Sequence, residues 1–315
     1  MTIRHRGIRR LGYVRLAVDD LDTAVAFAQD TLGLMPHDES NSDRALLRCW
    51  HEPQSFTFVL ERGAPALVEI GFQVLDEEDL QSASHRVRSA GVNVTESPAG
   101  EPLPDLGPSI AFQVPDGPAL RLFAHQVLPG FVTAGNGGAD WNVPKSLRHT
   151  QAPLYLTHVG VTSPNPPAVI EFLTTRLDFG ISELLTTDDG GTTLSALLFR
   201  TNHGQDIAIY PGVEARLHHV AFEKEDEVDI LREATWLRQD GVRLDAYGPT
   251  RQSYGRTFSV HFWDPCGIRY EMCAGHRFSE LHPDFKPVRW TESNLDKALS
   301  FYDTLENKEF LSPSL

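Results

Sequence analysis

Apolar and polar residues follow two periods along the C-terminal half of the chain. Residues 217–222 alternate as in a half-buried strand, and residues 228–239 have the 3.6-residue period of an amphipathic helix. The residues that this period places near one face are Val228, Leu231, Thr235 and Leu237. Asp240-Gly241 ends the helix, because glycine suits the left-handed position after a helix. Three strands separated by Gly/Pro turns are then predicted at 242–246, 257–263 and 268–272.

The same order of strand, helix and further strands recurs elsewhere in the chain. Residues 68–73 match residues 218–223 at a shift of 150, and residues 13–32 match residues 158–177 at a shift of 145. The difference between the two shifts is the length of a loop insertion. The chain is therefore predicted to be a duplication, and each half divides into two units of about 55–60 residues. The other units are centred on residues 11–34, 66–124 and 155–180.

Helices that are interspersed with short antiparallel strands favour an α+β fold. We expect an N-terminal domain at residues 1–130, a Gly/Pro-rich linker at 131–153 and a C-terminal domain at 154–276. Residues 277–315 belong to no repeat unit and form a predicted tail, with a helix that begins at Thr291.

Composition narrows the class of protein. The 315 residues suffice for two domains, and the net charge of −15 disfavours binding to nucleic acid or to a membrane surface. The sequence shows neither the roughly 20 consecutive apolar residues of a membrane span nor the apolar core of a signal peptide. Three cysteines make no disulfide framework, so we expect a reducing, cytoplasmic setting.

Three polar positions distinguish the C-terminal half from its N-terminal counterpart. His158, His219 and Glu271 each lie within a predicted strand among apolar neighbours. The matching residues of the N-terminal half are Tyr13, Glu69 and Arg121. Two imidazoles and one carboxylate are the ligand set that suits Fe(II), Mn(II) or Zn(II) with open positions for substrate. The repeat thus predicts a metal centre in the C-terminal half alone.

Neighbouring residues have simpler interpretations. A single histidine in an apolar strand is usually a packed or surface residue, and only the set of three indicates a metal. Strand alternation is expected to put His218 on the face opposite His219. In the N-terminal half, the opposite charges of Glu69 and Arg121 predict a structural salt bridge.

These residues carry a family resemblance. The doubled halves, the His158, His219, Glu271 set and the turn Asp264-Pro265-Cys266-Gly267 resemble the vicinal oxygen chelate superfamily. Within it, residues 248–251 (Gly-Pro-Thr-Arg) and the tail at 286–302 resemble type I extradiol ring-cleaving dioxygenases of the catechol 2,3-dioxygenase kind. The resemblance covers essentially the whole chain.

The resemblance implies both a fold and an activity. The fold would be four βαβββ modules in two domains, each an incomplete, cup-shaped β-barrel. The C-terminal cup would hold Fe(II), with Mn(II) as the alternative, and the protein would be a homo-oligomer, a tetramer or a dimer. The activity would be O₂-dependent opening of a catechol-type ring next to its diol.

The residues expected around the metal depart from the family pattern. Relatives have a histidine where this chain has Gln205, and a second histidine where it has Gln252. The tyrosine found three residues before the Asp-Pro turn is His261 here, and Tyr254 is a nearby phenol. Glutamine can donate a hydrogen bond but cannot carry a proton at neutral pH. We therefore expect His261 and His203 to share the acid–base work.

Two other functions stay open on the sequence alone. The altered residues around the metal also fit a metal-dependent isomerase, hydrolase or lyase of the same superfamily, which oxygen uptake would distinguish. A cup-shaped protein that only binds an aromatic compound would leave the three ligand-type side chains without a use.

Overall fold

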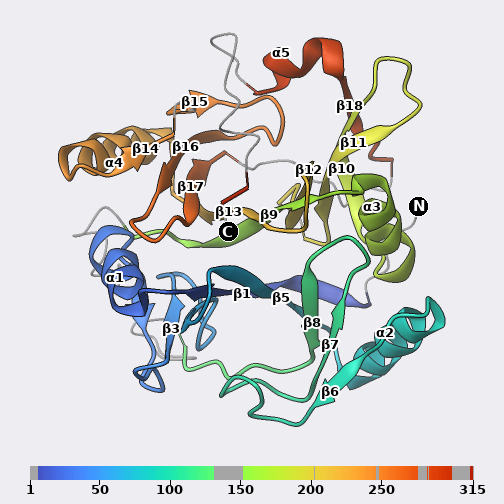
Figure 1. The fold of residues 1–315 in the computed structure, drawn as a ribbon, viewed down its shortest axis with the longest axis horizontal. Coiled ribbons are helices and arrows are strands. Elements are labelled where there is room, and N and C mark those ends of the chain that lie inside the picture. The colour runs from blue at the N-terminus through green and yellow to red at the C-terminus, as the bar shows by residue number, and fades with distance from the viewer. Residues whose placement is uncertain are drawn as a thin grey trace.

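Two open β-sheets, one from each half of the chain, make up most of the molecule, as Figure 1 shows. This computed structural model describes residues 6–130, 152–201, 203–245, 248–275, 282, 284–299 and 313–314. The predicted linker, except for its last two residues, and the predicted tail beyond residue 299, except for residues 313–314, lie outside the described residues.

The order of elements is the same in each half. The N-terminal half comprises β1 (Ile8–Val18), α1 (Leu21–Ala26), the π-helical turn η1 (Phe27–Thr31), β2 (Met35–Pro36), β3 (Arg44–Arg48), β4 (Phe58–Arg62), β5 (Ala66–Val74), α2 (Glu77–Ser89), β6 (Thr95–Ser97), β7 (Ser109–Gln113) and β8 (Ala119–Phe123). The C-terminal half comprises β9 (Tyr155–Ser163), α3 (Pro166–Arg176), β10 (Gly180–Thr186), β11 (Thr193–Phe199), β12 (Ile207–Pro211), β13 (Leu217–Glu223), α4 (Glu227–Gln239), β14 (Arg243–Leu244), β15 (Thr250–Arg251), β16 (Phe258–Trp263) and β17 (Arg269–Ala274). Four βαβββ modules, as implied by the family resemblance, are thus present.

Strand pairing repeats between the halves. The first sheet has the order β2-β3-β4-β1-β5-β8-β7-β6, and the second has β14-β16-β17-β13-β9-β12-β11-β10-β18, where β18 is Val288–Thr291 of the tail and β15 is paired to β16. In the first sheet β1 is parallel to β4 and antiparallel to β5, which is parallel to β8. In the second, β9 is likewise parallel to β12 and antiparallel to β13, which is parallel to β17. The repeated pairings confirm the duplication.

One continuous apolar core lies between the two sheets. Phe58 of β4 meets Phe222 of β13 edge to face at 5.8 Å between ring centroids, and Tyr270 of β17 at 6.1 Å. A smaller buried cluster lies apart from this core in each half: Tyr13, Leu46, Phe56, Val59, Leu103, Leu106 and Phe123 in the first, and Leu197, Ala208, Tyr210, Tyr254 and Ala298 in the second. These clusters mark the interiors of the two cups.

Helix α4 forms where the periodicity predicts it, but its buried face is not the predicted one. Val228 and Leu231 are each 49% exposed, whereas Ile230 and Leu237 are buried. Glu233 lies on the buried face, and because this residue is charged, the apolar pattern of the sequence does not indicate that face. Its carboxylate is buried because Lys224 Nζ lies 3.0 Å away, in an ion pair whose members are both almost fully buried.

The described part of the tail packs against the C-terminal cup. Strand β18 (Val288–Thr291) runs parallel to β10 and leads into a 3₁₀ turn, η3 (Glu292–Asn294), and then into α5 (Leu295–Leu299). Thr291 begins this helical segment as predicted, in a capping box with Asn294. Among the helices of the described residues, none has the length and apolar character to cross a membrane.

Candidate metal centre

His158, His219 and Glu271 come from three neighbouring strands at the middle of the second sheet. Strand β13 lies between β9 and β17, and its residue Ala221 is paired with both His158 and Glu271. His219 precedes Ala221 by two residues and therefore projects from the same face. Gly160 makes room for the imidazole of His219, because an added Cβ would lie 2.5 Å from that ring. The register of the strands thus brings the three side chains together.

The three potential ligand atoms form a nearly equilateral triangle. His158 Nε2 lies 3.0 Å from His219 Nε2, and Glu271 Oε2 lies 3.1 and 3.2 Å from those two nitrogens. All three residues are at most 2% exposed. Adjacent ligands of an octahedral ion with bonds of about 2.1 Å are about 3.0 Å apart, so the spacing fits one face of such an octahedron. The donor set and its spacing therefore fit a divalent transition metal.

The charges of the triad also suit a cation. Burial alone would raise the pKa of Glu271, but the surrounding imidazoles, His261 first and then the hydrogen-bonding His158 and His219, hold it well below its usual value. Burial lowers the pKa of His219. The site therefore offers a carboxylate together with a neutral His219 ring, and ionised carboxylate and neutral imidazole are the forms in which these groups bind metals.

The residue before each histidine ligand contacts that ligand. Thr157 Oγ1 lies 2.6 Å from His158 Nδ1, and His218 Nδ1 lies 2.7 Å from His219 Nδ1. The expectation that His218 faces away from the site was wrong, because a β-bulge interrupts the alternation of β13 at this residue. Arg269 Nη1 lies 3.1 Å from His218 Nε2 on the far side. Neither Thr157 nor Arg269 was predicted, since a bulge has no periodic signature in the sequence.

His261 is the candidate acid–base residue that lies against the triad. It is paired across β16 and β17 with Glu271, and its Nε2 lies 3.6 Å from Glu271 Oε2. Its ring meets that of His219 edge to face at 5.4 Å, and it is 1% exposed. Burial lowers the pKa of His261, so the neutral ring is favoured.

The remaining predicted residues have other surroundings. Gln252 Nε2 donates to Ser259 Oγ at 3.0 Å, and the hydroxyl of Tyr254 lies 2.9 Å from Ser195 Oγ. Gln205 is buried, and its Nε2 would be 3.3 Å from a Cβ added at Gly255. His203 is half-buried and lies against the ring of Tyr155, with 5.2 Å between ring centroids.

The other side of the C-terminal cup is apolar. Leu197, Ala208, Tyr210 and Tyr254 are buried there and meet Ala298 of α5, while Trp290 and Leu295 of the tail pack against them. Glu183 fastens the tail, because its carboxylate accepts from Trp290 Nε1 at 2.7 Å and from Arg256 Nε at 3.0 Å. The cup therefore holds the triad and, next to it, a buried apolar cluster whose Tyr210 ring lies 6.1 Å from that of His219.

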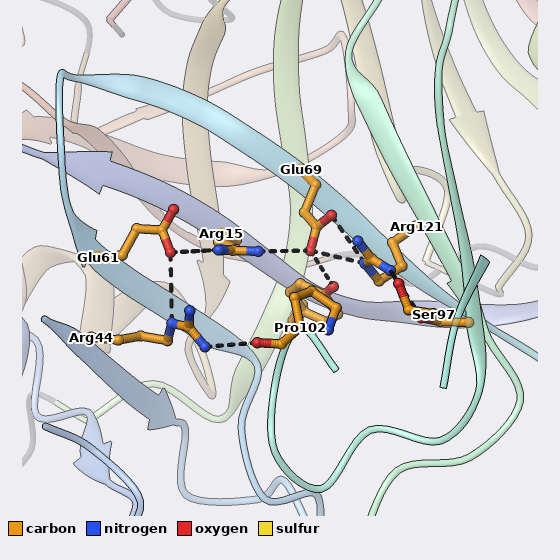
Figure 2. Close-up of polar contacts among 9 residues, drawn as sticks. Arg15, Arg44, Glu61, Glu69, Ser97, Pro102 and Arg121 are labelled. Carbon is orange, nitrogen blue, oxygen red and sulfur yellow. Dashed lines mark hydrogen bonds and ion pairs between the residues drawn. The ribbon is translucent and has the colours of Figure 1, made fainter. Parts of the chain in front are cut away.

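The matching positions of the N-terminal cup hold an ion-pair cluster, which Figure 2 shows in part. Arg121 Nε donates to both oxygens of Glu69, at 3.0 and 3.1 Å, and the hydroxyl of Tyr13 donates to Glu69 at 2.7 Å. Arg15 links Glu69 to Glu61. The predicted salt bridge between Glu69 and Arg121 is confirmed.

Comparisons with known proteins agree on one family. Residues 69–126 match the model of the catechol 2,3-dioxygenase-like N-terminal domain, and residues 155–272 match that of the glyoxalase/bleomycin resistance protein/dioxygenase superfamily. The chain is 30% identical to the metapyrocatechase of Pseudomonas sp. (strain CF600), over 98% of both proteins. It is 27% identical to a manganese-dependent 2,3-dihydroxybiphenyl 1,2-dioxygenase of Geobacillus genomosp. 3, over 94% of both. The crystal structure of the 2,3-dioxygenase LapB from Pseudomonas sp. KL28 superimposes with a TM-score of 0.83 at 28% identity, covering 92% of this chain and all of that one.

Proposed function

Because the chain belongs to the extradiol ring-cleaving dioxygenases of the vicinal oxygen chelate superfamily, we propose that it opens a catechol-type aromatic ring next to its diol with O₂. We propose His158, His219 and Glu271 as the residues that hold the catalytic metal. The observation that carries this assignment is the triangle of their Nε2 and Oε2 atoms, 3.0–3.2 Å on each side, inside a buried cup.

We propose Fe(II) as the metal and keep Mn(II) as the alternative, because one relative is named as manganese-dependent and both ions accept this ligand set. When bound, such an ion supplies Lewis acidity to the diol and a common binding place for diol and O₂. A single carboxylate among the ligands keeps the site cationic enough to favour an ionised diol.

The protein's own groups have separate roles in this proposal. The buried apolar wall at Leu197, Ala208 and Tyr210 packs against the ring and excludes water from it. His261 Nε2 takes a proton from the diol and returns one later, since a neutral imidazole is a competent base near neutral pH. Gln205 and Gln252 can only hydrogen-bond, because an amide does not titrate in this range.

Tyr254 and His203 have supporting roles in the proposal. Burial raises the pKa of Tyr254, so its phenol stays protonated and can act as a hydrogen-bond donor in the cup. His203, which packs on Tyr155, stays a candidate for proton exchange with solvent.

We also propose a homo-oligomer, a tetramer or a dimer, working in the cytoplasm. The family resemblance supports the oligomer, and the three free cysteines Cys49, Cys266 and Cys273 support a reducing compartment.

Metal analysis combined with oxygen uptake tests the function. Protein purified without air is expected to contain one Fe(II) or Mn(II) per chain, and to consume O₂ and form a yellow product with at least one member of a panel of substituted catechols. Metal-loaded protein that consumes no O₂ across the panel would refute the proposal. Turnover of a related substrate without O₂ uptake would indicate an isomerase, hydrolase or lyase, the other function that the altered residues Gln205, Gln252 and His261 fit.

A further inference from the structure

Both sheets contain β-bulges at the same places in the repeat. In the second sheet the extra residues are Thr157 on β9 and His218 on β13. In the first sheet they are the residues that match these two in the repeat, Gly12 on β1 and Val68 on β5. A bulge carries two adjacent residues opposite one partner residue and changes the direction of a side chain. Because the N-terminal half, which lacks the candidate ligands, has the same bulges, they belong to the fold and do not depend on a metal.

The two halves fill these bulges with different chemistry. Gly12 and Val68 have no polar side-chain atoms, and no metal ligand follows either of them. Thr157 and His218 each present a polar atom within 2.7 Å of the Nδ1 of the histidine that follows. Only the half with the candidate metal centre therefore has a hydrogen-bonding residue at each bulge.

Side-chain volume has changed along with the chemistry at the first bulge. An added Cβ at Gly12 would lie 2.4 Å from the ring of Phe123, so that half has no room for a side chain there. The residue that matches Phe123 in the repeat is Cys273, which is small and leaves space for Thr157. The hydroxyl of Thr157 reaches His158 through this space.

The second bulge has a further support. His218 is fully buried between His219 and Arg269, whose Nη1 lies 3.1 Å from His218 Nε2. The ring of Tyr210 packs on His218 at 4.5 Å between centroids. Arg269 is itself fully buried and has Asp245 within 3.4 Å of its Nε. The residue of the N-terminal half that matches Arg269 is Ala119, so the contact of an arginine with the second bulge is also confined to the half with the candidate ligands.

We propose that Thr157 and His218 are positioning residues of the metal centre, set by the two bulges to hold the rings of His158 and His219 with Nε2 toward the metal. This inference rests on the proposed metal centre. The hydroxyl of Thr157 can accept a proton from His158 Nδ1, and the tautomer with that proton leaves the Nε2 lone pair for the metal. For His219 Nε2 to bind the metal, the proton of the 2.7 Å contact must lie on His219 Nδ1 with His218 Nδ1 as the acceptor, and this hydrogen bond then fixes the plane of the His219 ring. Loss of such partners typically weakens metal binding about 10- to 100-fold.

Mn(II) titration of the full-length, metal-free protein tests this role, with the EPR signal of free Mn(II) as readout. We expect two variants, Thr157→Val and His218→Val, each to weaken Mn(II) binding by about 10- to 100-fold. Valine at position 218 is the residue that the N-terminal half has at its matching bulge. Thr157→Ser keeps the hydroxyl and is expected to bind within about threefold of wild type. The matched control is Thr162→Val on β9, the strand that carries Thr157 and His158. This variant loses a hydroxyl hydrogen bond to the backbone carbonyl of Glu214 and contacts no candidate ligand, so it is expected to bind Mn(II) as wild type does.

Two results would overturn the inference, and they are distinguishable. Wild-type protein that binds no Mn(II) would remove the metal centre and the proposed function with it. Wild-type protein that binds Mn(II) while Thr157→Val keeps the same affinity would leave the function intact and refute the positioning role. Circular dichroism identifies variants that have not folded, and Thr157→Val decides the question even when the buried His218→Val does not fold.

Discussion

Replacing Glu69 with glutamine is expected to destabilise the protein by about 3 kcal/mol without removing the proposed metal centre. Glu69 and Arg121 are 5% and 6% exposed, and two hydrogen bonds of 3.0 and 3.1 Å join them. Breaking a buried ion pair on one side costs about 3–5 kcal/mol, because the other charge stays buried without compensation. We expect the lower end of this range, since glutamine keeps one acceptor oxygen and Ser97 and Ser109 still accept from Arg121.

Equilibrium unfolding in urea, followed by circular dichroism, measures this change. A loss of 3 kcal/mol is roughly a hundredfold change in the unfolding equilibrium constant. The matched control is Glu61→Gln, whose partners Arg15 and Arg44 lie nearer the rim, with side chains 12% and 29% exposed, and which is expected to cost about 1 kcal/mol.

A double replacement separates the ion pair from simple packing. Glu69→Leu combined with Arg121→Met removes both charges and is expected to be more stable than Glu69→Gln alone. Mn(II) affinity should equal that of wild type in every one of these variants, because the cluster lies in the half without the candidate ligands. The reasoning would be refuted if the free energy of unfolding of Glu69→Gln lay within about 1 kcal/mol of that of wild type. It would also be refuted if the double variant were no more stable than Glu69→Gln.

Three further predictions concern titratable groups. Alanine at both His261 and His203 is expected to lower kcat by about a hundred- to ten-thousandfold with metal content unchanged, and intact turnover would contradict the acid–base assignment. Glu233→Gln is expected to lower the free energy of unfolding by about 3 kcal/mol, because the charge of Lys224 stays buried without its partner. A decrease in the urea midpoint that is smaller than the decrease caused by Glu61→Gln would argue against this. Burial raises the pKa of Asp264 to about 6, above its unfolded value of about 4, so the folded protein binds this proton more readily and loses stability as pH rises between these values. Asp264→Asn should flatten that part of the stability profile, and an unchanged slope would count against it.

The module order and the convergence of His158, His219 and Glu271 can be predicted from the sequence for one physical reason. A duplication lets each residue be compared with its match in the other half, and a chemical difference between His219 and Glu69 stands out against a shared apolar pattern. Strand periodicity then places such residues on a common face, and the structure brings them within 3.2 Å.

The features that the sequence did not predict depend on departures from that periodicity. Strand alternation predicts the wrong face for His218, because a β-bulge puts this residue out of register. The helical period predicts the wrong buried face for α4 because Glu233 is charged, and its partner Lys224 lies in the loop that precedes the helix. In both cases the deciding contact joins residues whose proximity no local pattern encodes.

The continuous core between the two sheets has a consequence for the half that carries no candidate ligands. Phe58 and its neighbours cover the face of the second sheet that Phe222 and Tyr270 would otherwise expose to water. Polar contacts also join the halves, since Glu52 Oε1 accepts from the backbone nitrogen of Leu156 and Arg200 donates to the carbonyl of Ile8. The N-terminal half can therefore differ from the C-terminal half in the chemistry of its cup, as it does at Tyr13, and still be needed to cover this apolar face. The C-terminal half is therefore expected to lose its fold when it is produced without the N-terminal half.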